Sequence, residues 1–116
     1  MQIHWRHPNE LVESERERAE ARIHELADGR SDLMDVWVDV EPSSAHHRNG
    51  DARVTIRGAV RRGSLVAQAA DVRVDAALRK ALDKFSHNVW NLRERRGDRR
   101  HRARALRDDV REAIGG

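Results

Sequence analysis

The stretch LMDVWVDVE, residues 33–41, is the clearest strand signal in the sequence. Apolar residues recur at every second position, which is the period of a β-strand with one buried face. The pattern predicts that one set of side chains points into a core, namely Met34, Val36, Val38 and Val40. The other set is expected on an open face of the sheet: Asp35, Trp37, Asp39 and Glu41. This stretch therefore predicts a sheet that is covered on one face only.

Three further segments alternate in the same way and are predicted as strands: Gln2–His7, Ala52–Val60 and Ser64–Ala70. Their inward residues are expected to be Ile3, Trp5, Val54, Ile56, Val60, Leu65, Ala67 and Ala69. Arg61-Arg62-Gly63 separates the last two segments, and this short interval predicts a tight hairpin turn.

A first helix is predicted over Glu10–Ala27, where apolar residues recur at helical spacing among many charges. Asn9 can cap it. Alternatively, the Ser14-x-x-Glu17 pattern matches a capping box and would start the helix one turn later. Gly29 is a natural residue to end the helix.

The best helix is predicted over residues 74–96, with one continuous apolar stripe. The stripe consists of Val74, Leu78, Ala81, Leu82, Phe85, Val89 and Leu92. Gly97 interrupts this pattern. Beyond it, Arg99–Ile114 has few apolar residues and is expected to be a separate amphipathic helix or a frayed segment.

The order of elements predicts an α+β fold of two layers, β-α-β-β-β-α, with a four-stranded sheet. Right-handed crossover connections would place both helices on one face of that sheet. Residues 1–96 are predicted to form the domain, and residues 97–116 a basic C-terminal extension that is partly helical or disordered.

The composition limits the class of protein. The chain has 116 residues, enough for one domain, and no cysteine, which excludes disulfides and fits a reducing cytoplasm. It has no apolar run of membrane-spanning length, and its first residues lack the apolar core of a signal peptide. A cytoplasmic protein without a membrane partner is expected.

Positive charge is concentrated at one end of the chain. Residues 1–86 carry 14 basic and 15 acidic residues, whereas residues 87–116 carry 9 arginines and 5 acids. Arginine forms bidentate contacts with phosphate and stacks on bases. The clustering therefore indicates a partner rich in phosphate, although a GC-rich genome explains much of the general preference for arginine over lysine.

With this order of elements and this charge pattern, residues 1–96 resemble the short ribosome hibernation promoting factor / ribosome-associated inhibitor A family, also called sigma-54 modulation proteins. The resemblance rests on the order and spacing of four stretches rather than on one motif. These are MQIHW, LMDVWVDVE, HRNGDARVTIRG and DAALRKALDKFSHNVWNLRERR. In the last stretch, Arg93 and Arg95 match basic positions of the family's second helix.

The resemblance implies a protein that binds the small ribosomal subunit and its rRNA during stress or stationary phase. It would lie in the channel for mRNA and tRNA, inhibit translation without chemistry and preserve idle ribosomes. The residues after Arg96 are too few for the dimerisation domain of the family's long form, so a short form is expected, monomeric when free.

The predicted rRNA contacts lie on the basic side of the second helix and at the hairpin turn. They are Arg79, Lys80, Lys84, His87, Asn91, Arg93, Arg95, Arg96, Arg61 and Arg62, with secondary contacts from Arg99, Arg100, Arg102 and Arg104. Lys84, Arg93 and Arg95 are all expected on the exposed face of the helix. Contacts of this kind bind the phosphate backbone and do not read bases.

Other functions have less support in the sequence. No nucleotide-binding loop or nucleophile elbow is present, and His46-His47 lies in a loop without a clear ligand set. We therefore expect no catalytic residue, metal, cofactor or small-molecule substrate. A general structured-RNA binder or RNA chaperone, and a protein-interaction module, stay as alternatives. Trp37 could stack on a base or pack against the tail or another protomer.

Overall fold

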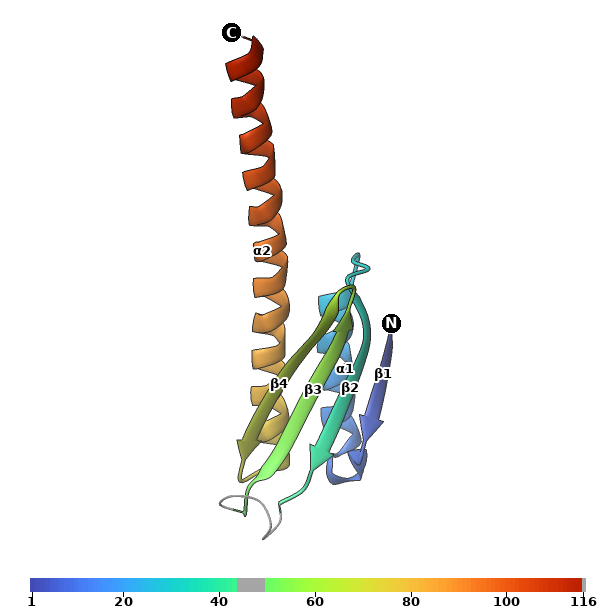
Figure 1. Ribbon diagram of the computed structural model, residues 1–116. Helices are drawn as coiled ribbons and strands as arrows, with labels where there is room; N and C mark the ends of the chain where they lie inside the picture. Colours follow the sequence, from blue (N-terminus) through green and yellow to red (C-terminus); the bar gives the residue numbers. More distant parts are fainter. Residues whose placement is uncertain (44–49, 116) are drawn as a thin grey trace.

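The strands form one four-stranded sheet, and both helices cover the same face of it (Figure 1). The computed structural model describes residues 1–43 and 50–115, with side chains for residues 1–43 and 50–95. The elements are β1 (Gln2–Arg6), the 3-10 turn η1 (Pro8–Glu10), α1 (Glu13–Ala27), β2 (Leu33–Glu41), β3 (Ala52–Val60), β4 (Gly63–Asp71) and α2 (Val74–Gly115). The predicted α+β class and the predicted order of elements are confirmed.

The strand order in the sheet is β1-β2-β3-β4. β1 runs parallel to β2, so the chain must cross over between them, and α1 supplies that connection. The other two pairs are antiparallel. Arg61 and Arg62 form the turn between β3 and β4, as predicted.

The core lies between the sheet and the two helices. Its fully buried side chains include Val36 and Val38 of β2, Ile23 of α1 and Phe85 of α2. Gly58 of β3 lies directly beneath Phe85: a Cβ atom there would be 2.7 Å from the Phe85 Cζ atom. The absence of a side chain at Gly58 therefore makes room for the largest residue of the core.

One residue of β2 faces the other way from the prediction. Met34 is 54% exposed, and Leu33 is buried in its place. The pairing of β2 with β3 is irregular between Leu33 and Asp35, which shifts the alternation at the start of the strand. From Val36 to Val40 the predicted alternation is confirmed.

Both predicted caps of α1 are wrong. The chain first makes η1, and α1 then begins at Glu13 after Val12, whose side chain makes no capping hydrogen bond. Ser14 therefore lies inside the helix. At the other end Gly29 has a φ of 68°, the left-handed conformation expected of a glycine that follows a helix.

α2 does not stop at Gly97, contrary to the prediction, but continues as one helix to Gly115 (Figure 1). A glycine inside a helix costs only about 1 kcal/mol relative to alanine. Arginine, glutamate, alanine and leucine on both sides of it are good helix formers, so one glycine does not outweigh them.

Candidate nucleic-acid interface

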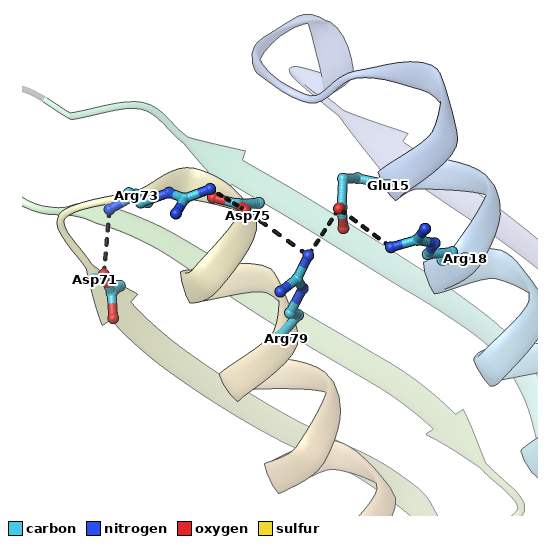
Figure 2. A network of polar contacts seen from close by, with 6 residues as sticks. All are labelled: Glu15, Arg18, Asp71, Arg73, Asp75 and Arg79. Carbon is cyan, nitrogen blue, oxygen red and sulfur yellow. Dashed lines mark hydrogen bonds and ion pairs between the residues drawn. The ribbon is translucent and has the colours of Figure 1, made fainter.

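The basic residues at the start of α2 are paired with acids. The Lys80 ammonium donates to Asp71 Oδ2 at 2.5 Å, and the Arg79 guanidinium donates to Glu15 Oε1 of α1 at 2.8 Å. Arg73 donates to Asp75 at 2.9 Å. Figure 2 shows the arginine contacts, which also include Arg18 beside Glu15. We call Arg73, Arg79 and Lys80 the acid-paired cluster.

The pairing changes the acidity of these groups. The hydrogen bond from Lys80 lowers the pKa of Asp71 below its ordinary value of 3.8. The hydrogen bond to Glu15 raises the pKa of Arg79 above its ordinary value. Both directions favour the ionised pair. The charges of Arg79 and Lys80, two of the predicted rRNA contacts, are thus already matched within the fold.

The next turns of α2 run along the free edge of β4. The Lys84 ammonium donates to the Gln68 carbonyl oxygen at 3.0 Å, and the Asn88 amide donates to the Val66 carbonyl oxygen at 3.3 Å. His87 is exposed, and Asn91 is half-buried. These contacts cover backbone acceptors of an edge strand, and they hold the Lys84 charge at the edge of the sheet.

Arg93 is not on the exposed face, so this expectation is wrong. Its side chain is only 13% exposed, and its Nε and Nη2 atoms donate to the two Asp32 carboxylate oxygens at 2.8 and 3.0 Å. Nη2 also donates to the Leu26 carbonyl oxygen at 2.6 Å. The bond from Arg93 lowers the pKa of Asp32. Arg93 therefore joins α2 to the segment between α1 and β2.

The pairing of β2 with β3 shows which parts of the chain meet at the end of the sheet near Arg93. Leu33, the first residue of β2, pairs with Val60, the last residue of β3. The loop before β2 and the β3–β4 turn therefore lie at the same end, beside the part of α2 that carries Arg93. Four exposed arginines come from these three segments: Arg30, Arg61, Arg62 and Arg95. We call this set the arginine end.

The arginine end differs from the acid-paired cluster in its charge balance. Within the described part of the chain, no carboxylate forms an ion pair with any of its four arginines. Arg61, Arg62 and Arg95 were predicted as contacts from the sequence, whereas Arg30 was missed. The signal for Arg30 was its place just before β2, because antiparallel pairing with β3 brings it near the hairpin turn.

The remaining predicted contacts are Arg96, Arg99, Arg100, Arg102 and Arg104. Their backbone belongs to α2, but their side chains lie outside the described residues. They stay a prediction.

The open face of the sheet carries a stacked row across three strands. The His4 and Trp37 rings are stacked, with centroids 5.3 Å apart and an interplanar angle of 19°. The Arg57 guanidinium carbon lies 5.0 Å from the Trp37 ring centroid. Trp37 thus points to the open face, as predicted. A hollow of about 470 Å³ borders the row, lined by His4, Trp5, Arg6, Trp37, Val38, Asp39, Thr55 and Arg57.

Among the side chains that the structure describes, those of residues 1–43 and 50–95, no three His, Asp or Glu residues come together in a group that could hold a metal ion. His46 and His47 lie outside the described residues. Over residues 1–43 and 50–115, no helix combines the length and the apolar character needed to cross a bilayer.

Two solved structures show the class of fold. A ribosomal subunit interface protein from Coxiella burnetii superposes with a TM-score of 0.64 at 14% identity, over 81% of this chain and 99% of that chain. The N-terminal domain of Protein Y from Thermus thermophilus superposes with a TM-score of 0.57 at 20% identity, over 78% and 94%. The chain shares their fold, and this likeness fits the family that the sequence resembles.

Comparison by sequence, in contrast to comparison by structure, gives no match. The chain matches no protein-family profile, and no curated protein matches its sequence.

Proposed function

We propose that the protein binds the small ribosomal subunit in the channel for mRNA and tRNA and thereby inhibits translation during stress or stationary phase. The main support is the arginine end, whose four arginines form no ion pair with a carboxylate in the described part of the chain, on a fold shared with a ribosomal subunit interface protein. The resemblance of residues 1–96 to the hibernation-factor family is a further support. We also propose that the protein is cytoplasmic and that it is a monomer when free.

The proposed mechanism is steric and electrostatic. The arginine end contacts rRNA phosphates, and Arg96 and the later arginines of α2 extend these contacts. Each neutralised phosphate releases condensed counterions, so the affinity falls as salt rises. The folded domain then occupies space that mRNA and tRNA need. No chemical step is required, and the protein is proposed to act without a cofactor.

Three of the rRNA contacts predicted from the sequence, Arg79, Lys80 and Arg93, take a different place in this proposal. Arg79 and Lys80 are held by Glu15 and Asp71, so binding an RNA phosphate there requires breaking or sharing an existing pair. Arg93 supports the arginine end by holding α2 against Asp32. Lys84, His87 and Asn91 lie between the two regions and serve as flanking contacts.

Sedimentation through a sucrose gradient tests the proposal. We expect the protein to migrate with small subunits at low salt, to leave them at high salt, and to reduce synthesis by a purified translation system. A protein that stays at the top of the gradient at low salt contradicts the proposal. Free duplex RNA that competes as well as small subunits would instead indicate a general structured-RNA binder. Binding that survives loss of the arginine end would indicate a protein-interaction module.

A further inference from the structure

The stacked row on the open face consists of planar side chains from β1, β2 and β3, and it stops before β4, the last strand of the sheet. His4, Trp37, Arg57 and Val66 are register partners across β1, β2, β3 and β4. The first three side chains stack on one another. Val66 is a short side chain and is 54% exposed. The outer face of the Arg57 guanidinium therefore borders a step in the surface, above Val66.

The two ends of this row differ in their charged neighbours. At the β1 end, His4 Nε2 lies 3.8 Å from the Asp35 carboxylate, which repels phosphate. At the β4 end, Lys84 reaches the edge of the strand at the Gln68 carbonyl oxygen. Arg62 lies just before β4, four residues from Val66 in the chain. A nucleic-acid strand is therefore favoured at the β4 end of the row.

We propose that one unpaired RNA base stacks on the outer face of Arg57 and fills the step above Val66. The Trp37 indole contacts His4 from β1 on one side of β2 and Arg57 from β3 on the other, so in this proposal the indole fixes Arg57 and does not meet the base itself. Guanidinium planes are common stacking partners for unpaired bases. The backbone of the strand then follows the β4 edge past Lys84 toward Arg62. This inference rests on the proposed function, because the strand belongs to the same RNA partner.

Base stacking and phosphate binding respond differently to two changes. An RNA hexamer whose sugars lack bases keeps its phosphates but cannot stack. Arg57→Lys keeps the positive charge but loses the planar guanidinium group on which a base could stack. Arg53→Lys is a matched control, since Arg53 lies on the same face of the same strand but opposite Glu41, outside the row.

Fluorescence anisotropy with labelled hexamers measures the effect. We expect the wild-type protein to bind the intact hexamer about tenfold more tightly than the abasic one. Arg57→Lys should remove most of this difference, and Arg53→Lys should not. Equal affinity for the two hexamers, no binding of either, or an equal effect of the two substitutions would overturn the proposal.

Methyl NMR of the wild-type protein gives a second readout. A base above Val66 should shift its methyl resonances by ring current, whereas the exposed Val12 and Val72 lie away from the row and should not shift. Unchanged Val66 methyls at saturating hexamer would overturn the proposal.

Ribosome sedimentation separates the two proposals. Co-sedimentation with unchanged Val66 methyls contradicts the stacking site alone. A selective Val66 shift without co-sedimentation contradicts the proposed function alone.

Discussion

The acid-paired cluster and the arginine end are both basic surfaces near α2, yet they differ in what surrounds each charge. Arg73, Arg79 and Lys80 lie within 3 Å of carboxylate oxygens. The exposed arginines from the loop before β2, the β3–β4 turn and the middle of α2 have no such partner among the described side chains. Counting basic residues along a helix therefore overstates the surface that can bind phosphate, because only uncompensated charge attracts it strongly.

The largest effect is expected when the two regions are neutralised separately. Replacing Arg61, Arg62 and Arg95 by Gln should weaken binding to small subunits on the order of 100-fold and lower the salt slope by about three. Replacing Arg73, Arg79 and Lys80 by Gln removes the same charge and should have a much smaller effect. Filter binding across a salt series measures both. Equal losses for the two variants would remove the distinction between the regions.

The second effect concerns stability. Arg93→Met should lower the free energy of unfolding by about 2–3 kcal/mol, because it leaves the Asp32 carboxylate without its bidentate partner in a half-buried site. Arg95→Met, two residues further along α2 and exposed, is the matched control and should change stability little. Urea denaturation followed by circular dichroism gives both values. A similar result for the two would mean that Arg93 does not hold α2 in place.

The pH dependence of stability sharpens the role of Asp32. Since folding lowers the pKa of this carboxyl below 3.8, its contribution is complete above about pH 4 and is lost as the pH falls through the folded-state pKa. Asp32→Asn should therefore be less stable than wild type at pH 7, and the gap should narrow below about pH 4. Urea titrations at pH 7, 5 and 3 test this. A gap that does not change with pH would contradict the ion pair.

The smallest effect is expected in the acid-paired cluster. Arg79→Gln removes the ion pair with Glu15, but exposed pairs contribute little and are screened by salt. We expect a slight loss of thermal stability in low salt that disappears in 1 M salt. A large loss that persists in high salt would show that this cluster holds α1 against α2 as firmly as Arg93 does.

Most of the fold follows from patterns that are local in sequence. The alternation in residues 36–40 and the stripe from Leu78 to Val89 are repeated signals that tertiary packing reinforces, and both were predicted correctly. The errors fall at the ends of elements, and they include the end of α2 that was predicted at Gly97. Met34 lies at an irregularity of the β2–β3 pairing, and the start of α1 depends on the short turn η1. Neither leaves a periodic trace in the sequence.

The candidate site was less predictable because it depends on contacts between residues far apart in the chain. Arg93 and Asp32 are 61 residues apart, as are Arg22 and Asp83. Helical periodicity places Arg93 on one side of α2, but it does not show that the Asp32 carboxylate lies beside that side. The same limit hid Arg30, which becomes part of a surface only once β2 pairs with β3.

The central claim is that the arginine end faces the RNA. Because the chain has no cysteine, an iron chelate that generates hydroxyl radicals can be attached at one chosen position. Ser64→Cys places it beside the β3–β4 turn, and Val72→Cys places it at the other end of the sheet, next to the acid-paired cluster. Bound to small subunits, the first should cut rRNA strongly within the channel for mRNA and tRNA, and the second only weakly. Stronger cutting from position 72, or equal cutting from both, would contradict the account.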